Sequence, residues 1–77
     1  MARVRTRILE LLSQMQIDRG ERISVTEIHR ATGISRQTIH RWMNNDLSRF
    51  DEDTVIAFCD FFDCTLNDLL YVDREAK

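Results

Sequence analysis

The sequence predicts an all-α fold of five short helices and no strands. Apolar residues recur at the three- and four-residue spacing of amphipathic helices, with little of the alternation that marks strands. Proline is absent, and Gly20 and Gly33 fall between apolar stripes, where they separate one helix from the next. Serine, threonine or aspartate stands at the expected start of four helices, where such side chains cap free amide groups. With 77 residues and no repeats, the chain is expected to form one domain over residues 1–77.

The first helix is expected over about Arg3 to Gln16. Its apolar residues form one stripe along a single helical face: Val4, Ile8, Leu11, Leu12 and Met15. The turn-forming sequence Asp18-Arg19-Gly20 is expected to end this helix.

The second and third helices are expected over Val25 to Ala31 and over Ser35 to Asn44. Ser24 and Glu27 are spaced as a capping box, in which a hydroxyl and a carboxylate each accept a free amide hydrogen. Gly33 supplies the left-handed residue that follows a helix end. The apolar residues expected to hold both helices against the core are Ile28, Ile34, Ile39 and Trp42.

The fourth helix is expected to follow Asp51 as its cap and the fifth to follow Thr65, placing C-terminal helices over about residues 52–72. Phe50 and Val55 are spaced as a hydrophobic staple across the first cap, and Asp68 completes a capping box with Thr65. The other residues expected to face the core from these helices are Phe58, Cys59, Phe62, Leu66, Leu69 and Leu70.

Composition excludes several classes of protein. No apolar run approaches the roughly 20 residues that cross a bilayer, and the first residues lack the apolar core of a signal peptide, so we expect a cytoplasmic protein without a membrane partner. Cys59 and Cys64 are too few for a disulfide framework and match no common zinc spacing. Their expected role is packing, with redox sensing and metal binding as alternatives. No cofactor and no metal site are expected.

Charge is segregated along the chain. The formal net charge is −2, yet residues 1–49 hold nine arginines and five acids, a net of +4, and residues 50–77 hold two bases and eight acids, a net of −6. Arginine is suited to bidentate contacts with phosphate or guanine. Because nucleic-acid binding depends on where positive charge lies rather than on its total, residues 1–49 are suited to it. The alternative is an ordinary solvated surface.

The most informative segment is residues 24–44, SVTEIHRATGISRQTIHRWMN. Its two expected helices meet at a short Thr-Gly-Ile turn, which forces a steep crossing and leaves the second helix protruding. A helix about 10–12 Å wide fits the major groove of duplex DNA. The polar residues that the core leaves free on this helix are Arg36, Gln37, Thr38, His40, Arg41 and Asn44.

Residues 24–72 resemble the Xre-type, phage-repressor-like (Cro-like) helix-turn-helix DNA-binding domains. The resemblance rests on TEIHRATGISRQTI, on FDEDTVIAFCDFF and on the terminal LNDLL, which together are more specific than the turn pattern alone. It implies a five-helix, phage-repressor-like fold whose third helix enters the DNA groove.

The resemblance also implies a role for individual residues. Those implied to contact bases are Ser35, Arg36, Gln37, Thr38 and Arg41. Those implied to contact phosphates are Ser24, Thr26, His40, Asn44 and Arg49, the last from the loop after the third helix. The chemistry agrees, since arginine can bond N7 and O6 of guanine together and glutamine can bond N6 and N7 of adenine. The alternative for Arg36, Gln37 and Arg41 is a solvated helix face.

Three residues depart from the family pattern. His29 stands where alanine is preferred between the two helices, which is expected to open their crossing slightly. Val25 replaces a polar phosphate-binding residue, and Asp63 replaces a glycine between the fourth and fifth helices. Phe61 and Tyr71 lie off the apolar stripes and are expected at the surface or in a self-association contact.

These observations predict a sequence-specific regulator of transcription that binds double-stranded DNA, a repressor acting by operator occlusion, since the length leaves no room for a sensing or activating domain. One reading helix covers few base pairs, so a homodimer on a two-fold operator is expected, with the acidic C-terminal third facing away from the DNA. The alternative is an antitoxin-like or other protein-interaction module that uses this acidic half, with an exposed apolar patch including Phe61, Ile56 or Tyr71. No catalytic set, phosphate loop or metal cluster points to an enzyme.

Overall fold

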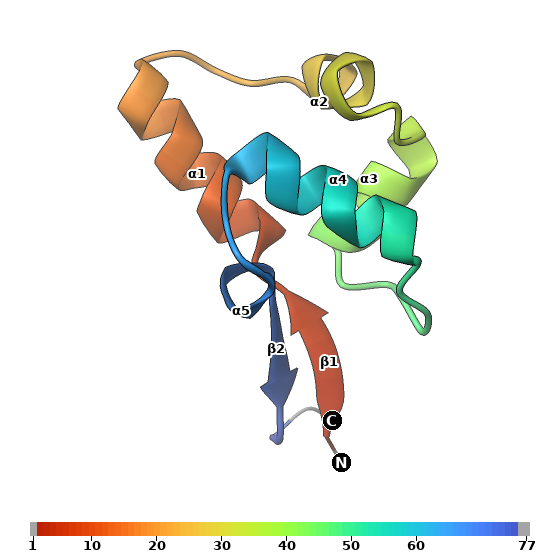
Figure 1. Ribbon diagram of the computed structural model, residues 1–77. Helices are drawn as coiled ribbons and strands as arrows, with labels where there is room; N and C mark the ends of the chain where they lie inside the picture. The colour runs from red at the N-terminus through yellow and green to blue at the C-terminus, as the bar shows by residue number, and fades with distance from the viewer. Residues whose placement is uncertain (1, 76–77) are drawn as a thin grey trace.

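The computed structural model describes residues 2–75, which form five helices and two strands. In chain order these are β1 (Arg3–Thr6), α1 (Ile8–Arg19), α2 (Val25–Thr32), α3 (Arg36–Met43), α4 (Glu52–Phe62), α5 (Leu66–Leu69) and β2 (Leu70–Asp73). The helices gather into one body, and the two strands extend from it as a short ribbon (Figure 1). Within the described range, no helix is both long and apolar enough to span a membrane.

The four helices after α1 begin at the capping residues that the sequence predicts. Each cap accepts a hydrogen bond from the backbone amide three residues on: Ser24 from Glu27 at 3.1 Å, Ser35 from Thr38 at 3.2 Å and Asp51 from Thr54 at 3.1 Å. At α5 the Asp68 carboxylate accepts from the Thr65 amide at 3.3 Å. These bonds satisfy amides that a helix start otherwise leaves without partners, which explains why the boundaries were predictable.

The first element differs from the prediction. Arg3–Thr6 form β1 rather than a helical turn, and α1 runs from Ile8 to Arg19, beyond the expected end at Gln16. Arg7 precedes α1 without a side-chain cap, so this helix start carries no capping signal in the sequence. At its other end Gly20, with φ of 68°, supplies the left-handed residue that stops the helix. Val4, expected on the helical stripe, is 42% exposed on the strand.

β1 pairs antiparallel with β2, so the expectation of no strands is wrong. The register places Arg3 opposite Asp73 and Thr6 opposite Leu70. Arg5 Nε lies 2.8 Å from the Asp73 carboxylate. This pairing also shortens the last helix, since the chain leaves α5 at Leu69 and continues as strand where helix was expected up to residue 72. A strand this short is set by its partner, which lies at the opposite end of the sequence, rather than by local periodicity.

The core lies where the five helices meet. The Trp42 ring is 4.7 Å from the Phe58 ring and 5.5 Å from the Phe50 ring, measured between centroids. Every helix contributes at least one fully buried side chain to this core: Ile8, Ile28, Ile39, Trp42, Phe58 and Leu69. The expected burial of Ile28, Ile34, Ile39 and Trp42 is confirmed. Leu66 is 54% exposed and does not join the core, contrary to expectation.

Thr6 ties the strand ribbon to the end of α3. Its hydroxyl donates to the Trp42 carbonyl oxygen at 2.7 Å, and its amide donates to Asn45 Oδ1 at 2.7 Å. Asn45 holds a φ of 57°, a left-handed conformation that asparagine tolerates better than most residues. Because Thr6 is buried, these bonds are shielded from water, and they fix β1 relative to the C-terminal end of α3.

Replacing Thr6 by valine keeps the side-chain shape and strand preference but removes the hydroxyl. The Trp42 carbonyl would lose its buried donor, so we expect the free energy of unfolding to fall by about 1–3 kcal/mol. Denaturant titration measures this change. Thr26→Val, at a half-buried helical position, is the matched control and should stay within about 0.5 kcal/mol of the unmodified protein. Equal midpoints for the two variants would show that the Thr6 bond does not stabilise the fold.

Candidate nucleic-acid interface

A tight turn joins α2 to α3. Gly33 has a φ of 75°, the left-handed region open to glycine, and its amide donates to the His29 carbonyl at 2.9 Å. The Thr32 hydroxyl donates to the Ile28 carbonyl at 2.7 Å and accepts from the Ile34 amide at 3.1 Å. The polar groups of the turn are therefore bonded within the motif, which holds α3 at a fixed angle to α2.

His29 takes part in this turn. Its Nδ1 lies 2.7 Å from the Ile34 carbonyl oxygen. Since a carbonyl only accepts, Nδ1 donates and carries the ring proton. The imidazole therefore bridges α2 to the residues before α3, a role that alanine cannot fill.

The other two departures from the family pattern are also accommodated. Val25 is half-buried and packs against the core instead of standing free for a phosphate. Asp63 adopts a φ of 51° at the end of α4 and so takes the left-handed position that a glycine would fill.

α3 has an apolar face on the core and a polar face toward solvent. Ile39 and Trp42 are buried. The residues of α3 that lie exposed on the other side are Arg36, Gln37, His40 and Arg41. Gln37 and Arg41 are one turn apart and therefore share a face. Eight helical residues extend about 12 Å, enough to reach along several base edges of a groove.

Ser35 and Thr38 differ from the other residues expected to contact bases. The Ser35 hydroxyl caps α3 and also donates to Thr38 Oγ1 at 2.9 Å, and Thr38 is half-buried. Within residues 2–75, no hydrogen bond or ion pair engages the side chains of Arg36, Gln37 or Arg41. These three are consequently the members of the set with polar groups ready for a ligand.

The residues expected to contact phosphates lie in three places. Ser24 and Thr26 lie at the start of α2. His40 lies in the last turn of α3 and Asn44 directly after it, and Arg49 lies in the loop before α4. Thr26 is half-buried, and the other four are exposed. The Ser24 oxygen accepts the Glu27 amide as the cap of α2, which leaves the O–H of Ser24 able to donate to a phosphate.

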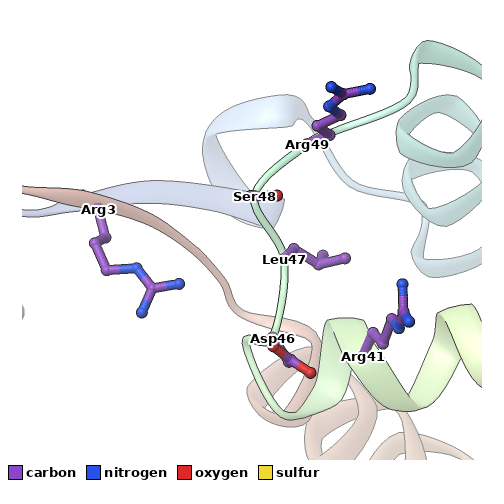
Figure 2. A pocket seen from close by; sticks show the side chains of 6 residues that line it. All are labelled: Arg3, Arg41, Asp46, Leu47, Ser48 and Arg49. Carbon is purple, nitrogen blue, oxygen red and sulfur yellow. The ribbon is translucent and has the colours of Figure 1, made fainter.

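Arg41 and Arg49 line a hollow of about 430 Å³ together with Arg3, Asp46, Leu47 and Ser48 (Figure 2). We call this the arginine hollow. Arg3 comes from β1, and sequence analysis did not select it as a site residue. The alternation Arg3-Val4-Arg5-Thr6 is a weak strand signal, but nothing local indicates that the strand lies beside the loop after α3.

A family model for the Cro/C1-type HTH DNA-binding domain matches residues 7–75. The match runs from the residue before α1 to the turn after β2 and therefore covers almost the whole chain. This chain belongs to that family. No curated protein and no solved structure matches it. The predicted resemblance is confirmed, and the protein is a DNA-binding domain rather than an enzyme.

The charges around α3 of this Cro/C1-type domain are uneven. Asp53 and Thr54, at the start of α4, line a second hollow of about 270 Å³ together with Ser35 and Thr38. Asp53, from the acidic C-terminal third, therefore lies beside two residues that are expected to contact bases. α3 has a carboxylate beside its first turn and the arginine hollow beside its last.

The aromatic residues expected at the surface or in a self-association contact, Phe61 and Tyr71, pack within the domain. Phe61 is half-buried, with its ring 5.0 Å from that of Phe62. Tyr71 is half-buried beneath the Arg7 guanidinium, which lies 4.2 Å from its ring centroid. Ile56 is 50% exposed on α4. Of the three residues of the apolar patch that the alternative function requires, only Ile56 is therefore exposed.

Cys59 and Cys64 are half-buried against the core, as their expected packing role requires. Burial, followed by the nearby Cys59 thiol, raises the pKa of the Cys64 thiol to about 11, so Cys64 is protonated at neutral pH. Among the residues that the structure describes, no three His, Cys, Asp or Glu side chains are grouped to hold a metal ion.

Proposed function

We propose that this Cro/C1-type domain is a sequence-specific regulator of transcription, acting in the cytoplasm, that represses by occupying its operator. The outward face of α3 carries the proposal. Arg36, Gln37 and Arg41 are exposed and unengaged, and the burial of Ile39 and Trp42 fixes the direction in which they point. Arginine and glutamine bond purine edges in bidentate pairs, which is how a helix distinguishes base pairs in the major groove. Occupying the operator blocks access to the DNA without any further activity.

The proposed binding species is a homodimer on a two-fold site. One helix of eight residues reaches only a few base pairs, so a single copy has little capacity to select a site. Two copies related by a two-fold axis double the sequence read. Sedimentation of the complex on its minimal site should show two chains per duplex. One chain per minimal duplex would contradict the dimer.

Selection of bound sites from random duplex DNA tests the function. We expect enrichment of one sequence with two inverted half-sites, whose centres lie about 34–36 Å apart, one helical turn. A pool that stays random after selection would overturn sequence-specific binding. Enrichment of a single half-site would support sequence-specific binding but contradict the proposed homodimer.

The alternative of an antitoxin-like or other protein-interaction module has less support. It relies on an exposed apolar patch in the acidic half, and of its three residues only Ile56 is exposed, with Phe61 and Tyr71 packed within the domain.

A further inference from the structure

The arginine hollow brings together residues from three separate parts of the chain. Arg3 lies on β1, Arg41 on α3 and Arg49 in the loop that leads to α4. Figure 2 shows Arg41 and Arg49 on one side of the loop at residues 46–49 and Arg3 on the other side. The hollow therefore adjoins the last turn of α3.

The charge of the hollow is not balanced within the domain. Three arginines line it, and Asp46 is the one acidic residue among the lining residues. Within residues 2–75, ion pairs engage Arg5, Arg7 and Arg19 but none of the three arginines of the hollow. Arginine side chains without an ion pair inside the domain remain free to bind an external anion such as a phosphate.

Arg3 in particular is left without its expected partner. The strand register places it opposite Asp73, yet the Asp73 carboxylate lies 2.8 Å from Arg5 Nε. Arg3 is exposed and lines the hollow. Its guanidinium is therefore available to a ligand outside the chain.

The strand that carries Arg3 is fixed to the helix that carries the base-contacting residues. Thr6, three residues after Arg3, donates to the Trp42 carbonyl at the end of α3 and to Asn45 just beyond it. The strand that carries Arg3 is therefore attached to the helix that carries Arg36 and Gln37. A contact made by Arg3 would be in register with contacts made by α3.

We propose that Arg3 binds a backbone phosphate of the operator, so that the strand ribbon extends the DNA interface beyond the helix-turn-helix motif. The inference rests on the proposed function, because its ligand is the phosphodiester of the same duplex. Arg49 holds the neighbouring part of that strand, while Arg41 at the edge of the hollow remains with the base-contacting residues of α3. The contact carries no sequence information and acts by charge and position.

Arg3→Ala tests the proposal, with Arg22→Ala as the matched control. Arg22 is an exposed arginine in the loop between α1 and α2. This loop follows the end of α1 that lies away from β1 (Figure 1). Affinity is measured over a series of salt concentrations on the selected site and on a scrambled duplex. We expect Arg3→Ala to weaken both by the same factor and to reduce the slope of log affinity against log salt by about one unit. Arg22→Ala should leave the slope unchanged. If both variants reduce the slope by the same amount, the effect is one of net charge and the proposal is overturned.

A second measurement locates the phosphate. Duplexes of the selected site carry one neutral methylphosphonate linkage at a time. One of these linkages should weaken DNA binding by the unmodified protein and have no effect on DNA binding by Arg3→Ala. If every linkage weakens both proteins alike while the site is still selected, Arg3 contacts no phosphate, and the proposed function stands without it.

Inorganic phosphate distinguishes a free anion from the DNA backbone. The hollow serves a small anion, and the DNA contact is refuted, if three results are found together. Inorganic phosphate binds the unmodified protein saturably, this binding is lost in Arg3→Ala, and no methylphosphonate linkage affects the two proteins differently. Failure of the unmodified protein to select any duplex would instead overturn the proposed function.

Discussion

Trp42→Ala is expected to lower the free energy of unfolding by about 3–5 kcal/mol, the cost of a cavity where a large aromatic side chain is removed. Trp42, on the inner face of α3, is 2% exposed and packs against Phe50 and Phe58. A small domain holds about 5 kcal/mol or little more, so most of this stability would be lost. The polar residues on the opposite face of α3 are presented together only when this helix is folded. DNA binding should therefore be lost with the fold.

Denaturant titration followed by circular dichroism measures this effect, because the substitution removes the only tryptophan and with it the indole fluorescence. His40→Ala is the matched control, an exposed position on the same helix, and should change stability by less than about 0.5 kcal/mol. An unchanged midpoint for Trp42→Ala would mean that α3 turns its other face to the core.

The second large effect is expected on DNA selectivity. Arg36→Ala and Gln37→Ala each remove a side chain able to make a bidentate base contact, a loss of about 1–3 kcal/mol at one position of the site. Affinity for the selected duplex should fall while affinity for a scrambled duplex changes little. The gap between specific and non-specific binding should therefore narrow for both variants.

Arg49→Ala provides the contrast within the same interface. Arg49 lies in the arginine hollow beyond α3, so we expect a phosphate contact whose loss weakens both duplexes together and lowers the salt slope by about one unit. Binding isotherms at several salt concentrations separate the two patterns. A change of sequence preference in Arg49→Ala alone would show that the loop, and not the start of α3, contacts bases.

Local signals explain why the helix-turn-helix was predictable. Ser24, Ser35 and Asp51 cap helices at the expected positions, and Gly33 supplies the left-handed residue of the turn. Each of these features depends on residues within four positions of one another. The exposed face of α3 follows from the same periodicity, since the burial of Ile39 and Trp42 determines which side chains remain outside.

The strand ribbon and the arginine hollow depend on contacts between distant residues. β1 exists because it pairs with β2, and Thr6 lies at the end of α3 because its polar groups meet Trp42 and Asn45. No short window of sequence reports these partners. The stripe that included Val4 therefore predicted a helix, and the place of Arg3 in the arginine hollow was missed for the same reason.

The most direct test of base contact by α3 removes single acceptor atoms from the DNA. In a selected site, 7-deazapurines replace one guanine or adenine at a time, which deletes only the N7 acceptor in the major groove. We expect at least one replacement to weaken the unmodified protein by about 5- to 150-fold, the equivalent of 1–3 kcal/mol. The same replacement should leave the affinity of the triple variant Arg36→Ala, Gln37→Ala, Arg41→Ala unchanged. If every purine can be replaced without loss of affinity, α3 does not recognise purines through the major groove and the central claim is wrong.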